Sequence, residues 1–300
     1  MEQEKRQNDS ATAIKVRLFL LHTAWIAALF FPITEPLLWL ALISFVVRMF
    51  GVEGGYHRYF SHRSFQTSRI FQFMLALLAT SSGQRGIIAW AEHHRNHHRH
   101  SDTPEDPHSP VVNSFWYAHF AWIWDDKHRN PIHTQVRDLT KFPELLFINQ
   151  HHYIATYGLI GSLFVLGQYS PILGSAGMGL EAVLWGFMIP TLLTFQMTMS
   201  INSVYHQDQI GSRLFNTPDH SKNVWWMAIP SLGAAWHNNH HRYGSAARSG
   251  FLWWQIDISY YIIRALGVLG LVWDIREVPE RVMARANVES APIGVASPQA

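Results

Sequence analysis

The chain has 300 residues, of which 48% are hydrophobic and only 15% are charged, and its net charge of +2 is too small to indicate a nucleic-acid partner. It contains no cysteine, which excludes disulfides, zinc–thiolate sites and iron–sulfur clusters. Its 19 histidines nearly match its 23 lysines and arginines, and so much imidazole without a thiol indicates a metal protein with nitrogen ligands.

The first apolar stretch follows a polar segment, residues 1–17, that has no cleavable signal pattern. No lysine or arginine occurs between residues 18 and 47. Pro32 and Pro36 break this stretch, which predicts two membrane spans at about 16–31 and 37–55. Because the linker between them is short, the two spans are expected to form an antiparallel hairpin.

A second hairpin is predicted from spans at about 153–169 and 180–201, again in a stretch without lysine or arginine. All basic residues then fall in three regions, 1–17, 48–141 and 213–285. Two hairpins place these regions on one side of the membrane, which is the positive-inside pattern. We therefore expect an all-α, multi-pass integral membrane protein with four transmembrane helices and both termini in the cytoplasm. The alternative, a soluble helical bundle, does not require such charge segregation.

Two other apolar stretches, residues 70–91 and 253–272, contain polar or charged residues in their interior. We interpret both as buried or interfacial helices that contribute to a cytoplasmic helical cap. Residues 1–280 are expected to form a single domain. Residues 281–300 contain much Ala, Pro and Ser, and are predicted to be a disordered tail.

Clustered histidines are the main chemical signal. They occur as His57-Arg-Tyr-Phe-Ser-His62, His94-Arg-Asn-His97-His98, Asn202-Ser-Val-Tyr-His206 and His237-Asn-Asn-His240-His241. Positions i, i+3 and i+4 share one face of an α-helix, so each histidine triplet is expected to point into one site, and Asn202 is expected to share a face with His206. His57 and His62 diverge by about 140° on a straight α-helix, so one of them is expected past a helix end.

Nine imidazoles and one asparagine are too many ligands for one ion, and they fit two ions with four or five ligands each. Ligand type alone allows Zn, Cu, Fe or Ni. A metal cluster without thiolate at the cytoplasmic mouth of a membrane bundle favours oxygen chemistry on a lipid. The alternative is that these segments are polar helices exposed to solvent.

On these four clusters, over about residues 15–275, the sequence resembles the membrane fatty-acyl desaturase family, in particular the stearoyl-CoA and Δ9 acyl-lipid desaturases. Three histidine boxes in this order are highly specific for the superfamily. The additional Asn202-x-x-x-His206 motif is typical of the acyl-CoA and Δ9-like branch.

The resemblance implies two iron ions held by nine histidines: His57, His62, His94, His97, His98, His206, His237, His240 and His241. It also implies that Asn202 holds a metal through water. Gln84, Trp90 and Thr198 stand where the family has residues that line the bend of an acyl tunnel, and they are predicted to bind substrate. No catalytic residue beyond the metal ligands is expected, but His108, Asp102, Glu105 and Asp106, in the loop after the second histidine cluster, could orient a ligand. The other ten histidines are not predicted to be ligands: His22, His93, His100, His108, His119, His128, His133, His151, His152 and His220.

The expected reaction is an O2-dependent desaturation that introduces a cis double bond, Δ9-like, into a fatty-acyl chain carried on CoA or a lipid. An alkyl C–H bond has no useful acidity, so metal and oxygen must provide the oxidant. The position of attack is expected to depend on the depth of the tunnel. The sequence lacks haem and flavin fingerprints, so we expect an external electron donor such as a ferredoxin or a small b-type cytochrome.

Two alternatives remain at this point. A hydroxylase or an alkene-forming decarboxylase on the same scaffold would share the first hydrogen abstraction with a desaturase. A membrane metal transporter or sensor would need polar ligands inside the spans, and the spans contain few.

Overall fold

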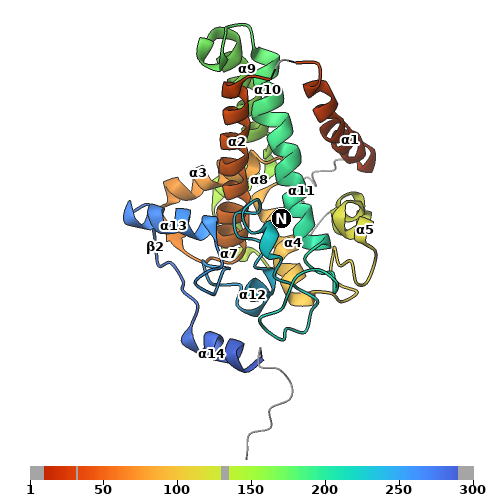
Figure 1. Cartoon of the computed structure of the whole chain (residues 1–300), viewed down its shortest axis with the longest axis vertical. Coiled ribbons are helices and arrows are strands. Elements are labelled where there is room, and N and C mark those ends of the chain that lie inside the picture. The colour runs from red at the N-terminus through yellow and green to blue at the C-terminus, as the bar shows by residue number, and fades with distance from the viewer. Residues whose placement is uncertain (1–9, 32, 130–134, 290–300) are drawn as a thin grey trace, which may run out of the picture.

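The structure is a computed structural model that describes residues 10–31, 33–129 and 135–289. Long helices extend along its long axis, and short helices and loops gather at one end (Figure 1). In chain order the elements are α1 (Ala11–Ala28), α2 (Glu35–Phe50), η1 (Gly51–Ser61), β1 (Gln66–Thr67), α3 (Arg69–Thr80), α4 (Ile87–His100), α5 (Phe115–His119), η2 (Ala121–Trp124), α6 (Asp126–Arg129), α7 (Arg137–Thr140), α8 (Pro143–Gln150), α9 (Tyr153–Tyr169), η3 (Pro171–Leu173), α10 (Gly179–Val183), η4 (Leu184–Met188), α11 (Ile189–Ser203), η5 (Trp225–Met227), α12 (His237–Arg242), α13 (Ile258–Val268), β2 (Val272–Trp273) and α14 (Glu280–Glu289).

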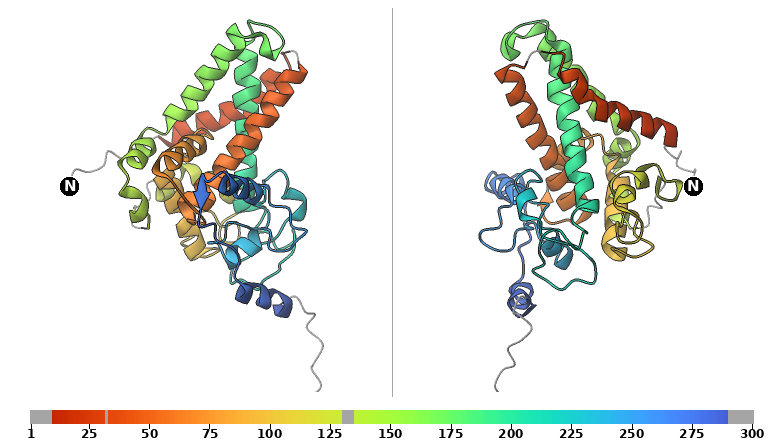
Figure 2. Two further views of the ribbon diagram at one scale, coloured as in Figure 1. Left: turned by 90° about the vertical axis from the view of Figure 1, so that its left-hand side faces the viewer. Right: turned by 45° about the vertical axis from the view of Figure 1, so that its right-hand side comes forward.

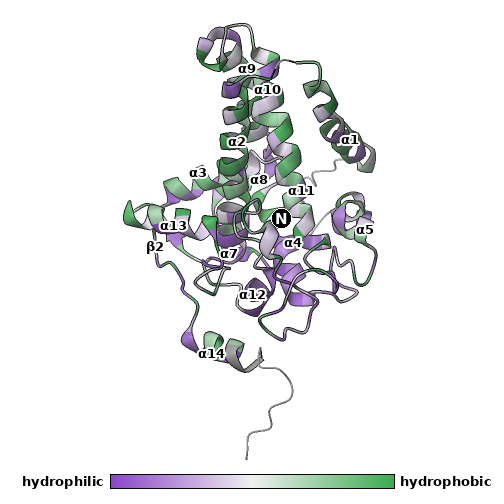
Figure 3. Ribbon diagram, in the orientation of Figure 1, coloured by the Kyte–Doolittle hydropathy of each residue, from purple (hydrophilic) through white to green (hydrophobic). Residues whose placement is uncertain are grey.

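The long helices form two hairpins whose linkers lie at the same end of the molecule (Figure 2). α2 packs against α11, and α9 packs against α10. The two linkers contact each other, because the Thr34 hydroxyl donates a hydrogen bond to the carbonyl oxygen of Leu173 at 3.4 Å. Hydrophobic residues dominate the long helices, whereas hydrophilic residues gather around α12 at the opposite end (Figure 3).

Three helices in the described part of the chain are long and apolar enough to cross a membrane, namely Ala11–Ala28, Glu35–Ser61 and Gly179–Ser203. The remaining expected span is α9, which has 17 residues. The predicted helical architecture is therefore confirmed, with strands limited to β1 and β2 among the described residues. The four-span arrangement stays a prediction.

The second long helix changes its winding before it ends. α2 continues into η1, a π-helical segment in which hydrogen bonds join residues five apart. The backbone N–H of His62 bonds the carbonyl oxygen of His57 at 3.1 Å, directly after the helix ends at Ser61. His62 thus lies past the helix end, as predicted. The divergence of a straight α-helix does not apply to the pair, because η1 is π-helical and His62 follows its end.

Proline distorts the last long helix, and α2 compensates for the distortion. Pro190 has no N–H to bond the carbonyl oxygen of Gly186, four residues earlier. The hydroxyl of Ser44 in α2 donates to this oxygen at 2.6 Å, and Arg48 Nη1 donates to the carbonyl oxygen of Phe187 at 3.2 Å. These bonds fix α11 against α2 along the path that leads to the histidines.

The largest hydrophobic core lies where η1, α3, α4, α8 and α13 meet, at the end of the long helices. β1 and β2 form a two-stranded antiparallel sheet beside it, in which Gln66 pairs with Trp273. This core positions η1 and α4, both of which contribute histidines.

Two expected segments differ from the structure. Residues 70–91 form parts of two helices, α3 and α4, because Gly83 and Arg85 adopt left-handed backbone angles with φ of 76° and 77°. The expected tail begins with helix α14, and its remainder, 290–300, lies outside the described residues. α13 occupies the middle of the segment 253–272.

Candidate metal centre

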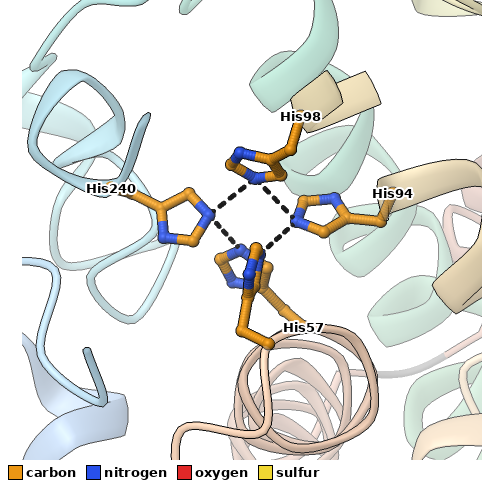
Figure 4. A group of neighbouring side chains, drawn as sticks. His57, His94, His98 and His240 are labelled. Carbon is orange, nitrogen blue, oxygen red and sulfur yellow. Dashed lines mark hydrogen bonds between the residues drawn. The ribbon is translucent and has the colours of Figure 1, made fainter. Parts of the chain in front are cut away.

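All nine predicted histidine ligands lie in two compact groups. The five-imidazole group consists of His57, His62, His94, His98 and His240, and the four-imidazole group consists of His97, His206, His237 and His241. Within each group, one ring nitrogen from every histidine lies within 4.8 Å of the others. Figure 4 shows four rings of the five-imidazole group turned towards one central point.

Each histidine triplet is divided between the two groups. In α4, His94 and His98 enter the five-imidazole group, whereas His97 enters the other. In α12 the division is reversed, since His240 joins the five-imidazole group and the pair at i, i+4 joins the four-imidazole group. The expectation that each triplet points into a single site was therefore wrong. One helix face therefore directs the i, i+4 pair into one group and the intervening histidine into the other.

The two asparagines between the histidines of α12 anchor this short helix. The side-chain oxygen of Asn238 accepts hydrogen bonds from the backbone N–H groups of Leu214 and Phe215, both at 2.8 Å. The Asn239 amide donates to the side chain of Gln255 at 2.8 Å. Both asparagines are fully buried. Their bonds hold a helix of six residues that could not be stable alone.

The contacts between ring nitrogens cannot all be hydrogen bonds. Nε2 of His94 lies 2.7 Å from that of His62 and 3.0 Å from that of His98, and Nε2 of His240 lies 2.9 Å from those of His98 and His57. A neutral Nε2 has either one proton or one lone pair in the ring plane, so it cannot serve two such partners. A shared ion satisfies them all, because nitrogens about 2.1 Å from a divalent ion and at right angles lie about 3 Å apart.

Carboxylates hold the opposite ring nitrogen of four of these histidines. The pairs are His57 Nδ1 with Glu53 at 2.9 Å, His97 with Asp106 at 3.0 Å, His206 with Asp102 at 2.8 Å and His241 with Asp219 at 2.7 Å. A carboxylate that accepts from Nδ1–H leaves the Nε2 lone pair free for a metal. Nε2 of His241 is buried without a hydrogen-bond partner among the described residues. The donor set therefore fits transition-metal ions.

Sequence reasoning identified Asp102 and Asp106 as possible orienting groups but missed the other two carboxylates. Glu53 stands four residues before His57, a spacing that could have indicated the contact. Asp219 gave no such signal, because the fold of the long segment between α11 and α12 brings it to His241. Glu105, also considered, is exposed and accepts a bond from Thr103.

The protonation preferences of the site suit metal binding. Burial lowers the pKa of His94, His98, His237 and His240 well below the usual range, which keeps these rings neutral. Burial alone would raise the pKa of Asp102, but hydrogen bonds from His206 and Ser109 outweigh it and lower the pKa to about 2.

The nine described histidines that were not predicted as ligands lie outside the two groups. His108 lies nearest, with its ring 4.5 Å from that of His97 and its Nδ1 3.6 Å from Asp106. His97, Asp106 and His108 could themselves surround an ion, but Asp106 already accepts the Nδ1–H of His97. His108 therefore fits a role in positioning His97. His133 lies outside the described residues.

The three residues predicted to bind substrate form one hydrogen-bonded chain. The Trp90 indole N–H donates to Gln84 Oε1 at 3.4 Å, and Gln84 Nε2 donates to Thr198 Oγ1 at 2.9 Å. The Trp90 ring stacks on His94 with ring centres 5.1 Å apart. The chain thus begins directly beside the five-imidazole group. Asn202, the predicted water-mediated ligand, lies half-buried in the last turn of α11.

Membrane-length helices that end at two clusters of converging imidazoles define a membrane-associated metal oxidoreductase. Comparison with known proteins narrows the class, because residues 34–266 match the family described as fatty acid desaturase. The chain belongs to this family, and it is an oxidoreductase that acts as a fatty-acyl desaturase.

Several relatives match over most of their length. The chain is 32% identical to a hex-5-enoyl-[acyl-carrier protein] acetylenase of Moorena producens (93% of this chain, 92% of the relative). It is 35% identical to Delta-9 acyl-lipid desaturase 2 of Arabidopsis thaliana (89% and 83%), and 31% identical to an sn-1 stearoyl-lipid 9-desaturase of Anabaena variabilis (89% and 97%). Their names differ in acyl carrier and in product, so family membership leaves both open for this chain.

Proposed function

We propose that this protein uses O2 to introduce a cis double bond, at a Δ9-like position, into a fatty-acyl chain carried on a lipid or on CoA. Two iron ions held by the five-imidazole and four-imidazole groups would be the cofactor. The main support for the proposal is that the hydrogen-bonded side chains of Trp90, Gln84 and Thr198 lie directly beside the five-imidazole group. The contact is the stacking of the Trp90 ring on His94. The names of the Arabidopsis and Anabaena relatives support the Δ9-like position and a lipid carrier.

Bound irons would supply, with O2, the oxidising power needed to remove hydrogen from an unactivated C–H bond. The neutral imidazoles would hold both ions, and Asn202 would hold one through water. The carboxylates on Nδ1 keep the rings in the tautomer and orientation that ligation needs. Five of the nine histidines are buried and the other four are half-buried, which would limit the access of bulk water to the reaction.

Selectivity among chemically similar methylenes requires that the acyl chain be fixed in place. Gln84, Trp90 and Thr198 are suited to this, because their hydrogen bonds join the α3–α4 turn, α4 and α11 into one rigid wall. An acyl chain that passes this wall would place one pair of adjacent carbons next to the ions.

We further propose four membrane spans, with α9 as the third, and both termini and the metal centre on the cytoplasmic side. Support comes from the contact between Thr34 and Leu173, which joins the two linkers that lack basic residues. A ferredoxin or a small b-type cytochrome would dock on the basic cytoplasmic face and deliver electrons. Labelling of single cysteines introduced at Ile33 and Gly174 in sealed vesicles tests the orientation, since both should react only from outside the cytoplasm.

The deciding experiment expresses the chain in a host that lacks its own desaturase and maps the fatty-acid products by gas chromatography and mass spectrometry. Desaturation removes two hydrogens and places a cis double bond at one position. Added oxygen would instead show a hydroxylase, and a shortened terminal alkene a decarboxylase. An alkyne formed only from supplied alkenoyl chains would favour the activity named for the Moorena relative. Metal uptake into vesicles without any lipid product would contradict the proposal.

A further inference from the structure

The carboxylates that hold the histidines are distributed unequally between the two groups. In the four-imidazole group, three of the four rings donate Nδ1–H to a carboxylate, from Asp106, Asp102 and Asp219. In the five-imidazole group, Glu53 is the one carboxylate that contacts a ring in the described part of the chain. The group with fewer imidazoles therefore has more negative charge around it.

These carboxylates are buried, and Arg213 reaches one of them, Asp219, through the Thr217 hydroxyl rather than directly. The side chains of Asp102, Asp106 and Asp219 are at most 7% exposed. Among the described residues, their hydrogen-bond donors are imidazoles, hydroxyls and backbone N–H groups, not lysine or arginine. Buried negative charge is costly unless it is compensated. A cation inside the four-imidazole group is the compensating charge that the geometry offers.

We propose that the two ion positions are inequivalent, and that Asp102, Asp106 and Asp219 make the four-imidazole group the position that holds its ion more tightly. The three carboxylates are positioning residues that act through the rings of His97, His206 and His241. They polarise these rings and increase their basicity as ligands, whereas four of the five rings in the other group lack this support. The inference rests on the proposed pair of irons, and it adds an order of affinity between them.

Asp102 allows its charge to be removed without loss of its hydrogen bonds to His206 and to the backbone of His220. Its Oδ2 accepts from His206 Nδ1 and from the backbone N–H of His220, both at 2.8 Å, and its Oδ1 faces the Ser109 hydroxyl at 2.6 Å. In Asp102→Asn, the amide oxygen would stay with the two N–H donors, and the amide NH2 would face the Ser109 hydroxyl, which loses its acceptor. His206 then keeps its orientation and loses only the negative charge behind it.

Asp219 gives the contrasting substitution. Its Oδ1 accepts from the Thr217 hydroxyl and from the backbone N–H and hydroxyl of Ser221, so an amide oxygen would be fixed there. In Asp219→Asn, the NH2 would then face His241 Nδ1 and force the proton onto Nε2. That tautomer cannot bind a metal, so the substitution removes one ligand from the four-imidazole group.

The test measures iron release from the purified, iron-loaded protein in the presence of a chelator, by elemental analysis over time. We expect two phases of one equivalent each in the wild type. Asp102→Asn should accelerate the slow phase by roughly tenfold to a hundredfold and leave the fast phase unchanged. Asp219→Asn should lose the slowly released iron. Glu53→Gln should accelerate only the fast phase.

Asp208→Asn is the matched control, because this exposed carboxylate bonds His220 and Lys222 and contacts no predicted ligand. It should change neither phase. Release of both irons in one phase from the wild type would overturn the inference while leaving the proposed function intact. Acceleration of both phases by Asp102→Asn would also overturn it, since the residue would then act on the whole fold. A purified protein without iron would contradict the proposed function as well.

Discussion

Gln84 donates a hydrogen bond from Nε2 to the hydroxyl of Thr198 at 2.9 Å, across 114 residues of sequence. The bond joins the turn between α3 and α4 to the middle of α11, which makes it a contact between the two halves of the chain. Trp90 donates a hydrogen bond to Gln84 and stacks on the ring of His94. A substitution at Thr198 can therefore alter the positions of side chains next to the metal centre.

Thr198→Val should therefore broaden or shift the position of the double bond. Valine keeps the shape of threonine but leaves the Gln84 amide without its acceptor, at a cost of about 1–3 kcal/mol. The iron content should not change. Mapping the double-bond positions in the products checks this. Thr23→Val is the control, because within the described part of the chain the Thr23 hydroxyl bonds only to carbonyl oxygens of its own helix. If both variants give the wild-type product at the wild-type rate, the Gln84–Thr198 bond does not contact the substrate.

His240→Ala should abolish desaturation while the protein stays in the membrane fraction. Nε2 of His240 contacts those of both His57 and His98, so its loss opens the five-imidazole group on two sides. Elemental analysis should show about one iron fewer per chain, in line with the loss of a ligand. His100→Ala, in the same helix as His98 but outside both groups, should keep full iron content and activity. Full turnover by the His240 variant would remove this residue from the ligand set.

Gly51→Ala should destabilise the protein by about 1–3 kcal/mol, the usual cost of overpacking. A Cβ at Gly51 would lie 2.9 Å from the carbonyl oxygen of Leu78, so α3 would have to move away from the start of η1. The iron content should fall too, because η1 carries His57. Thermal unfolding followed by size-exclusion chromatography measures the effect. In Gly158→Ala, a helical position with open space around it, stability should be unchanged or rise by up to about 1 kcal/mol. Equal melting temperatures for both variants would contradict the close approach.

The sequence was sufficient to select the nine histidines that gather in the two groups, because residues at i, i+3 and i+4 share one face of a helix wherever that helix packs. It was not sufficient to divide them, since the assignment of His97 and His98 to different groups depends on where α12 lies relative to α4. The sequence also did not predict that His57 and His62 would lie in one group. Helix propensities of single residues do not show that hydrogen bonds join residues five apart in η1.

Long-range folding explains the other omissions. Asp219 reaches His241 only because the segment before α12 folds back, and that path depends on contacts such as Asn238 with Leu214 and Phe215. By contrast, the apolar helices were visible from composition. Their largest boundary shift is at the end of the second helix, which was expected near residue 55 and continues through η1 to Ser61.

The iron-free protein should lose stability as the pH falls below about 6.5, the ordinary pKa of histidine. Burial lowers the pKa of His62, His94, His98, His237 and His240 well below that value, so these rings stay neutral in the folded state. Below this pH the unfolded chain binds protons at these rings and the folded chain does not, so the free energy of unfolding decreases as the pH falls. The stability that the neutral rings contribute is complete above about pH 6.5. Each ring contributes up to about 1.4 kcal/mol per pH unit.

Chemical unfolding of the chelator-treated protein in detergent, at about pH 7 and about pH 5, measures the slope. His240→Ala removes one such ring, and its slope should be shallower by up to about 1.4 kcal/mol per pH unit. A stability that does not change over this range would show that the imidazoles of the empty groups are free to take up protons, and so are not buried as neutral ligands.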